Sequence, residues 1–308
     1  MTTIIDGGLA TELEARGLDL SDHLWSARVL LSQPQAIEDA HLAYFRAGAQ
    51  VATTASYQAT VPGLAAAGLD RAEALDVIRE SVALASRARD RAVDESGIDR
   101  AGLLVAGSVG PYGAMLADGS EYRGDYDPGR GVLREVHLPR IEALLDAGAD
   151  LIALETIPTV REAEVLVELL VEVGATGWLS YQCRDGRSTA AGEPIEAAVS
   201  LAEGCPAIVA VGVNCTAPRH IGALLAAAGR ATAKPLIAYP NGGDRWDAGT
   251  RRWDADAPED AFQPDAIGDL ARGPRPVDWL GGCCGVGPPD IRALTASLEG
   301  DADAPVRG

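Results

Sequence analysis

The feature that most constrains the fold of this chain of 308 residues is an alternation of short apolar runs with longer helical patterns. Several runs are apolar on both faces, which is typical of parallel strands that helices cover on both sides. Eight runs have this character: Thr3–Asp6, Gln50–Tyr57, Leu103–Val109, Asp150–Ile157, Gly177–Cys183, Ala207–Cys215, Pro235–Tyr239 and Val277–Cys283. The patterns between them predict helices at Pro34–Ala47, Arg71–Val93, Val132–Ala147, Val160–Val173, Pro194–Ala202, Arg219–Ala228, Pro264–Ala271 and Pro288–Leu298.

Eight strand-then-helix units predict an α/β fold, the (β/α)₈ or TIM barrel, for which roughly 250 residues is typical. A doubly wound open sheet that binds a dinucleotide would carry GxGxxG after its first strand, but the chain reads DGGLAT there. No internal repeat or linker divides the chain, so we expect one barrel domain over residues 1–300 and a flexible tail over 301–308. Two long segments, Gly107–Gly131 and Pro240–Glu259, follow strands and are expected over the C-terminal face of the barrel.

The charge balance excludes several classes of partner. The chain has 26 Lys and Arg against 45 Asp and Glu, a net charge of −19, whereas binding to nucleic acid needs clustered basic residues. We therefore expect neither a nucleic-acid nor a membrane partner. The first residues show no basic region followed by a long apolar stretch, and the expected compartment is the cytoplasm. Five cysteines in such a chain should be thiols and not a disulfide framework.

Active residues of a TIM barrel lie at the C-terminal ends of its strands. At those predicted ends stand Asp6, Ser56, Tyr57, Ser108, Glu155, Thr156, Gln182, Cys183, Asn214, Cys215, Tyr239, Asn241, Cys283 and Cys284. Three cysteines from two distant strands thus share one rim. Three thiolates with one open position are typical of a catalytic zinc site. Glycines around Cys283 and Cys284 allow the distorted backbone that two adjacent ligands need.

Each of these assignments has a plainer alternative. A cysteine is often a small buried hydrophobe, and this interpretation is preferred for Cys183 and Cys205. Asp6 and Glu155 suit the ammonium group of an amino-acid substrate, but an arginine partner, or an Asx turn for Asp6, would also explain them. Backbone N–H groups of Gly7 and Gly8 are candidates to bind the carboxylate of the substrate. His41, His137 and His220 fall in helical patterns and His23 in a loop, so they are assigned structural roles.

These motifs together resemble the homocysteine S-methyltransferases, in their S-methylmethionine-dependent branch. The resemblance runs from about residue 4 to residue 298. It is carried by Asp6–Gly17, Thr53–Thr60, Gly107–Tyr126, Leu154–Pro158, Gly212–Pro218, Tyr239–Gly243 and Gly281–Gly285. Its most specific part is GVNC, ending at Cys215, followed by GGCCG, which holds Cys283 and Cys284.

The resemblance implies a (β/α)₈ barrel in which Cys215, Cys283 and Cys284 hold Zn²⁺ and the sulfur of L-homocysteine is the fourth ligand. It implies that Asp6 and Glu155 lie near the substrate amino group, and that backbone around Gly7 and Ser56 lies near its carboxylate. Asn214 would shape the site beside the metal, and the role of Tyr57 is less defined. The implied methyl donor is S-methylmethionine or S-adenosylmethionine, and the chain is expected to be a monomer or a small homo-oligomer.

The sulfonium group of that donor would be bound by charge and by cation–π contacts. Candidates in the two long segments are Tyr112, Asp118, Glu121, Tyr122, Asp125, Tyr126, Trp246 and Trp253. Three other functions stay open. In the first, the methyl acceptor is another thiol or a selenol such as selenocysteine. In the second, the barrel is a metal-dependent hydrolase, which predicts His and Asp ligands at strand ends. In the third, the chain is a non-enzymatic zinc or redox sensor, which leaves Asp6 and Glu155 unexplained.

Overall fold

The computed structural model describes residues 2–20, 25–243, 245–247, 252–254 and 260–299. Within these ranges the elements follow one another as β1 (Thr3–Ile4), α1 (Leu9–Ala15), α2 (Trp25–Ser32), α3 (Pro34–Arg46), β2 (Val51–Thr53), α4 (Val61–Ala66), α5 (Arg71–Ser96), η1 (Arg100–Gly102), β3 (Leu104–Val109), α6 (Tyr112–Leu116), η2 (Ser120–Tyr122), α7 (Arg130–Asp146), β4 (Leu151–Ile157), α8 (Val160–Val173), β5 (Gly177–Tyr181), α9 (Ile195–Ser200), β6 (Ile208–Asn214), α10 (Pro218–Ala231), β7 (Leu236–Tyr239), β8 (Arg245–Asp247), β9 (Arg252–Asp254), α11 (Pro264–Asp269), η4 (Leu270–Arg272), β10 (Trp279–Leu280) and α12 (Pro288–Glu299).

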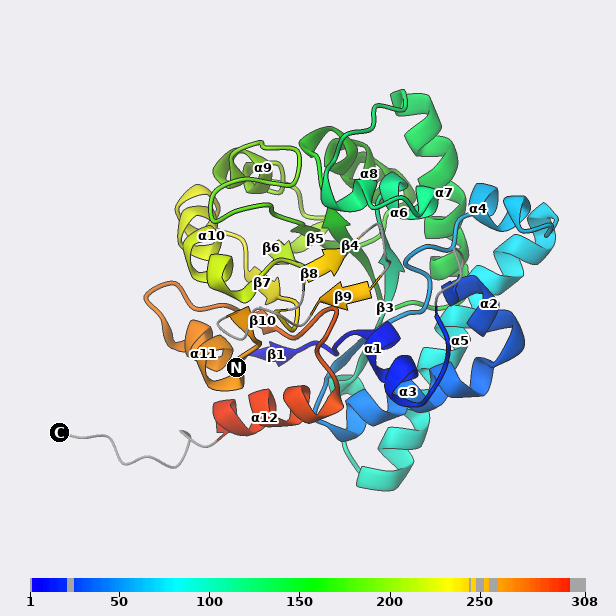
Figure 1. Cartoon of the computed structure of the whole chain (residues 1–308), viewed down its shortest axis with the longest axis horizontal. Coiled ribbons are helices and arrows are strands. Elements are labelled where there is room, and N and C mark those ends of the chain that lie inside the picture. The colour runs from blue at the N-terminus through cyan, green and yellow to red at the C-terminus, as the bar shows by residue number, and fades with distance from the viewer. Residues whose placement is uncertain (1, 21–24, 244, 248–251, 255–259, 300–308) are drawn as a thin grey trace.

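Eight of the strands form one parallel sheet, in the order β1-β10-β7-β6-β5-β4-β3-β2. A parallel bridge between Ile5 and Val51 joins the two ends of this order. Figure 1 shows the strands at the centre with the helices arranged around them. The predicted TIM barrel is confirmed, because the eight strands are the eight runs that the sequence singles out.

The apolar residues fall into two groups that match this architecture. A large cluster lies between the strands and the surrounding helices, and it includes fully buried residues such as Ile78, Leu144 and Leu170. A smaller cluster contains residues from most strands, with Trp178 and Tyr239 as its largest members. The interior of a TIM barrel is filled by inward-pointing side chains in this way. The barrel is thus a packed support for the groups at its rim.

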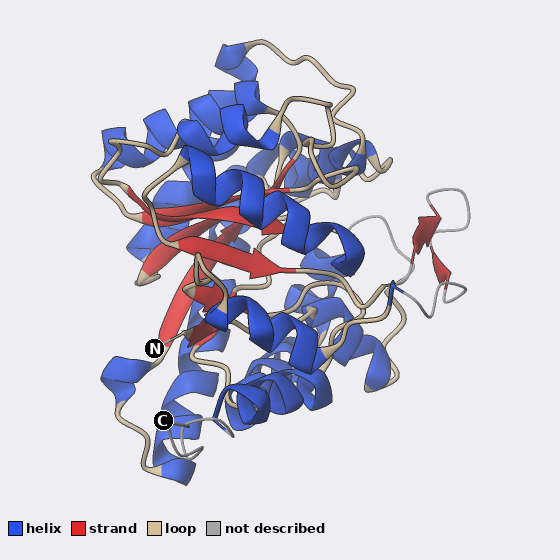
Figure 2. Ribbon diagram, turned by 90° about the vertical axis from the view of Figure 1, so that its left-hand side faces the viewer, coloured by secondary structure: helices blue, strands red, loops and turns tan. Residues whose placement is uncertain are grey.

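The two long segments contain structure that the sequence patterns do not predict. The first holds α6 and η2, and the second, in its described part, holds the antiparallel pair β8 and β9. Figure 2 shows this pair standing out on the side toward which the barrel strands point. Helices α1, α2 and α4 are also additional to the prediction. Among the described residues no helix combines the length and apolar character needed to cross a lipid bilayer.

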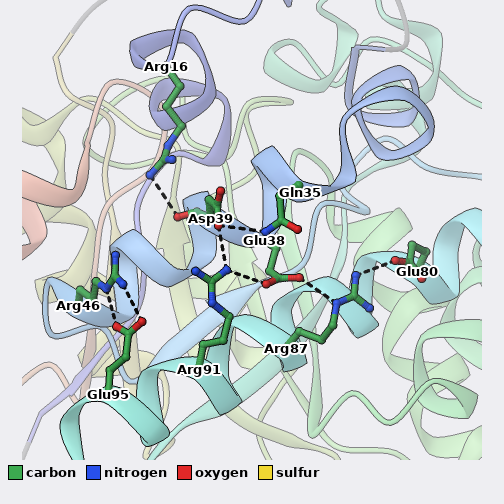
Figure 3. Close-up of polar contacts among 9 residues, drawn as sticks. All are labelled: Arg16, Gln35, Glu38, Asp39, Arg46, Glu80, Arg87, Arg91 and Glu95. Carbon is green, nitrogen blue, oxygen red and sulfur yellow. Dashed lines mark hydrogen bonds and ion pairs between the residues drawn. The ribbon is translucent and has the colours of Figure 1, made fainter.

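A network of ion pairs joins α3 to α5 on the outside of the barrel (Figure 3). At its centre Glu38 is 7% exposed and accepts hydrogen bonds from Arg87 at 2.9 Å and from Arg91 at 2.7 Å. Arg91 also donates to Asp39 at 2.9 Å. Burial opposes ionisation of Glu38, but the two arginines outweigh it and lower the pKa of the carboxyl group. The charged form of Glu38 therefore helps to dock α3 on α5.

We expect Glu38→Gln to lower the free energy of unfolding by about 1 kcal/mol at pH 7, since both arginines are partly exposed and screened. A lowered pKa stabilises the fold above the unfolded value of about 4.3, and this contribution is lost as the pH falls through the folded value. The difference from the unaltered protein should therefore vanish below that range. Urea unfolding of both proteins, at pH 7 and at a pH below the folded pKa of Glu38, measures this difference. As a control, Glu95→Gln, in the exposed pair with Arg46, should leave stability unchanged.

Candidate active site

A pocket opens at the C-terminal end of the barrel, where the ends of β1, β2, β3, β4, β6, β7 and β10 meet. Its lining contains three cysteines, two carboxylates and three tyrosines, and it includes no Lys, Arg or His among the described residues. The lining residues are Asp6, Gly7, Gly8, Leu9, Ala10, Thr53, Thr54, Ala55, Tyr57, Ser108, Tyr122, Glu155, Thr156, Cys215, Tyr239, Gly282, Cys283 and Cys284. The pocket is therefore acidic and aromatic.

The sulfur atoms of Cys215, Cys283 and Cys284 all lie within 4.8 Å of one another. The distance between the sulfurs of Cys215 and Cys284 is 3.9 Å. In a tetrahedral zinc site with bonds of about 2.3 Å, two sulfur ligands stand about 3.8 Å apart. The described part of the chain offers no other group of three possible His, Cys, Asp or Glu ligands. The predicted cysteine cluster is thus confirmed, and its dimensions fit a metal ion.

The local backbone explains how two adjacent cysteines face one centre. The chain leaves the sheet after Leu280 and turns, with the N–H of Val286 bonded to the carbonyl of Cys283 at 3.0 Å. Gly285 is the third residue of this turn and has φ of 80°, as in a type II turn, which requires glycine or asparagine there. On the other side Cys215 follows β6 with φ of 46°, which redirects its side chain from the direction of the strand.

The electrostatics of the cluster favour a bound cation. Hydrogen bonds from Cys215 and Cys283 lower the pKa of the Cys284 thiol. Hydrogen bonds with Cys283 and Cys284, together with burial, raise the pKa of Cys215, which is 3% exposed. Three thiolates in one buried space repel one another, so a divalent ion is what would allow all three to ionise.

Asp6 lies two residues after the end of β1 and points its carboxylate across to β2. It accepts hydrogen bonds from the backbone N–H of Thr53 at 2.8 Å and from the hydroxyl of Thr53 at 3.0 Å. Burial nevertheless raises the pKa of Asp6 well above its ordinary value, and the charge of Glu155 raises it further. Neither of the alternatives open from sequence is seen: Thr53 is the partner, in place of an Asx-turn bond, and the described residues contain no arginine paired with Asp6.

Glu155 lies near the end of β4, 8% exposed, and accepts a short hydrogen bond from the hydroxyl of Ser108 on β3. Burial raises its pKa to about 7, although the bond from Ser108 opposes this shift. No lysine or arginine among the described residues pairs with it. Two carboxylates that lack cationic partners thus face one pocket, and a ligand ammonium would supply the missing positive charge.

Asn214 and Ser56 lie behind the wall of the pocket and hold its members in place. The side chain of Asn214 accepts from the N–H of Thr156 at 2.7 Å and donates to its hydroxyl at 2.8 Å. This pairing supports Thr156 at φ of 60°, next to Glu155. Ser56 is fully buried and donates to the carbonyl of Ser108 at 2.8 Å. Neither residue is part of the described pocket lining, and each acts on the pocket through the neighbour that it holds in place.

Gly7 and Tyr57 line the pocket as well. The N–H of Gly8 donates to the carbonyl of Val286 at 2.9 Å, so the expectation that Gly8 offers a free N–H to a substrate is wrong. Tyr57 is half-buried, but its hydroxyl is enclosed, and this burial raises the pKa of the phenol well above the ordinary value. It therefore stays neutral and offers an aromatic face.

Of the loop residues considered for sulfonium binding whose side chains the structure describes, Tyr122 alone lines the pocket. Tyr126 bonds to Glu162, Asp118 caps the N–H of Ser120, and Asp125 pairs with Arg123 at the surface. These three contacts are structural. The side chains of Trp246 and Trp253 and the loop residue His23 lie outside what the structure describes.

The other two cysteines and the three described histidines fit their structural assignments. Cys183 is buried and its pKa is raised by burial, and Cys205 packs at the edge of the main core. His41, His137 and His220 lie in α3, α7 and α10, away from the sulfur cluster. The histidine ligands that a hydrolase of this fold would need are therefore absent from the described rim.

Comparison with known proteins decides the family. The family model described as homocysteine S-methyltransferase matches residues 3–298. The chain belongs to the homocysteine S-methyltransferase family. A homocysteine S-methyltransferase from Escherichia coli is 48% identical over 296 residues, covering 95% of this chain and 94% of the relative. The selenocysteine Se-methyltransferase of Brassica oleracea is 42% identical over 96% of this chain and 88% of its own length.

A solved structure from the same family has the same fold. The metallated form of the homocysteine methyltransferase MmuM from Escherichia coli superposes with a TM-score of 0.85 and is 45% identical, with 96% of each chain covered. That relative thus carries metal in a barrel of this shape. In the described part of this chain, Cys215, Cys283 and Cys284 form the cluster that offers three ligands to a metal ion.

Sequence reasoning missed part of the wall of this homocysteine S-methyltransferase family site. Leu9 and Ala10 of α1 and Thr53 of β2 line the pocket. Helix α1 spans only seven residues, too few for its apolar spacing to be distinctive. The weak signal available was the apolar stretch directly after Gly7 and Gly8, which follows the rim residue Asp6.

Proposed function

We propose that this chain transfers a methyl group from a sulfonium donor, S-methylmethionine or S-adenosylmethionine, to the thiol of L-homocysteine and so produces methionine. Zn²⁺ is the proposed metal, held by Cys215, Cys283 and Cys284. The observation that carries the proposal is the cluster of three sulfurs within 4.8 Å at the edge of an acidic pocket. Soft thiolate ligands with one position left open favour zinc over hard cations.

The charge of the pocket supports both substrates. The ammonium group of homocysteine fits between Asp6 and Glu155, whose buried carboxylates lack a cationic partner among the described residues. The sulfonium of the donor is also a cation, and the faces of Tyr57 and Tyr122 offer it cation–π contacts. An anionic methyl donor would meet the two carboxylates and the three sulfurs there, and no Lys, Arg or His side chain in the described lining.

The proposed reaction needs little acid–base chemistry from the protein. Zinc, when bound, lowers the pKa of an incoming thiol so that the sulfur is nucleophilic at neutral pH. Asp6 and Glu155 orient the acceptor through its ammonium, and the tyrosines orient the donor. The displacement joins an anionic sulfur to the carbon of a cationic donor, so the charges cancel and the leaving sulfide requires no proton. Alignment of the two substrates is then the main task of the side chains.

A second acceptor has specific support. The relative named selenocysteine Se-methyltransferase is 42% identical over nearly the whole chain. A selenol is a soft nucleophile like a thiol, and selenocysteine carries the same ammonium group. Parallel assays with homocysteine and selenocysteine at equal concentration decide which acceptor has the higher kcat/KM.

The proposed function is tested on freshly reduced protein. We expect about one zinc ion per chain and formation of methionine from homocysteine with at least one of the two sulfonium donors. Removal of zinc with a chelator should abolish turnover, and zinc added back should restore it. A protein that forms methionine at the same rate without metal would contradict the proposal, and a competition assay ranks the donors.

A further inference from the structure

A buried chain of polar side chains beneath the segment 110–126 takes no part in the chemistry proposed above. It consists of Glu162 in the first turn of α8 together with His137 and Arg140 on α7, and none of these is more than 1% exposed. Burial of such groups is costly unless they are paired and hydrogen-bonded. The contacts of this buried chain therefore indicate what it holds.

At one end, Glu162 fixes both ends of the loop that carries Tyr122. One carboxylate oxygen accepts the backbone N–H of Tyr112 at 2.6 Å, and the other accepts the hydroxyl of Tyr126 at 2.5 Å. The rings of Tyr112 and Tyr126 lie 5.6 Å apart. Tyr122 stands between these two anchors in the sequence and lines the pocket. One carboxylate thus closes the loop on the barrel.

His137 connects Glu162 to Arg140, the member of the buried chain that contacts Tyr57. The Nε2 atom of His137 lies 2.8 Å from Glu162, and its Nδ1 atom lies 2.6 Å from the guanidinium of Arg140. Because a guanidinium only donates, Nδ1 must accept, so the hydrogen on Nε2 is donated to Glu162. The neutral form of the ring agrees with burial, which lowers the pKa of His137, with Arg140 acting in the same direction.

Arg140 completes the connection by donating to two backbone carbonyls, those of Gly110 and Tyr57, the latter at 3.4 Å. The ring of Tyr57 lies directly against Gly110, where an added Cβ would stand 2.6 Å from a ring carbon. The backbone of Tyr57 is thus held by Arg140 and its ring by Gly110. Both tyrosines of this side of the pocket depend on the same buried chain.

We propose that Glu162, His137 and Arg140 are positioning residues that hold Tyr57 and Tyr122 at the pocket and thereby set the affinity for the methyl donor. The other binding groups have separate supports: Thr53 holds Asp6, Ser108 holds Glu155, and the turn at 283–286 holds the paired cysteines. The buried chain should therefore act on the donor and leave homocysteine and the metal unaffected. The inference rests on the proposed function for the identity of the donor.

The test is Glu162→Gln, which keeps the size of the side chain but replaces one acceptor oxygen by a donor. We expect the KM for the sulfonium donor to rise about tenfold or more, because misplaced contacts weaken productive binding. The KM for homocysteine and the zinc content should stay within about twofold by the same reasoning. The matched control is Glu164→Gln, on the same helix but exposed and paired with Arg130, which should change none of these quantities.

Tyr126→Phe removes only the hydroxyl that bonds to Glu162, and it serves where Glu162→Gln does not fold. It should raise the donor KM in the same direction, and the double variant should raise it by less than the product of the single effects. Amide exchange of segment 110–126 should be faster in both single variants than in Glu164→Gln. This second readout needs no turnover.

The outcomes separate the two proposals. An unchanged donor KM in folded variants, or equal rises of both KM values with loss of zinc, would overturn the positioning role. Failure of the unaltered protein to methylate homocysteine would instead contradict the proposed function. In that case, amide exchange of segment 110–126 still decides whether Glu162 holds the loop. Unchanged amide exchange in Glu162→Gln would overturn that role.

Discussion

Replacing Cys283 with alanine should remove both the metal and the activity. The backbone N–H of Cys283 donates to Pro240 and its carbonyl accepts from Val286, so alanine keeps the turn while one of three sulfur ligands is lost. Metal sites depend on their full ligand set, and we expect zinc content to fall close to zero and methyl transfer to fall by about 10³-fold or more. Metal analysis and a methyl-transfer assay on the same sample measure both.

A matched variant separates the metal site from the general loss of a thiol. Cys183→Ala removes a buried thiol that lies outside the cluster, and zinc content and turnover should stay near those of the unaltered protein. Circular dichroism of both variants checks that the barrel is folded. Full activity in Cys283→Ala would rule out the sulfur cluster as the centre of the reaction.

Under the proposed function Glu155 faces the ammonium of homocysteine. Replacing Glu155 with glutamine should then raise the KM for homocysteine by about 10²-fold, because the loss of such a buried charge costs several kcal/mol. Glutamine keeps the shape and an oxygen for the hydroxyl of Ser108. Zinc content should not change, since Glu155 is outside the three-sulfur cluster. Initial rates at varied homocysteine and saturating donor measure the effect.

The control for this prediction is a different acceptor. A thiol of the same chain length that lacks the amino group cannot use Glu155, so the unaltered protein and Glu155→Gln should methylate it at similar rates. If the variant is equally impaired with both acceptors, Glu155 has a role other than binding the ammonium. The pH dependence offers a second check, because burial raises the pKa of Glu155 to about 7 and bound ammonium should lower it.

The eight strands of the barrel were predictable because each is an apolar run with a distinct helical pattern after it. Helix α8 was predicted with the bounds that the structure shows, Val160–Val173. The last strand was not: the pattern predicts Val277–Cys283, but the structure pairs only Trp279–Leu280. The reason is that the chain leaves the sheet at Gly281 to form the turn that presents Cys283 and Cys284, and apolar periodicity carries no information about such a turn.

The sulfur cluster could be predicted because three cysteines at strand ends are rare and chemically distinctive. The groups that support the site could not. Glu162 reads in the sequence as an ordinary acidic residue at the start of a helix, yet it is buried and bonds to Tyr112 and Tyr126. The positive φ of Cys215 and Thr156 likewise depends on contacts with distant segments, such as the bonds between Asn214 and Thr156. Such features arise only when the barrel closes.

The absence of basic side chains from the described lining of the pocket bears on how one catalytic cycle gives way to the next. A sulfonium arrives as a cation and departs as an uncharged sulfide, so the groups that attracted it lose their hold once the methyl group has moved. The loss of this charge favours release of the spent donor without a change in the protonation of the protein. Under the proposed function, the electric field of the site alone makes fresh donor bind in preference to used donor.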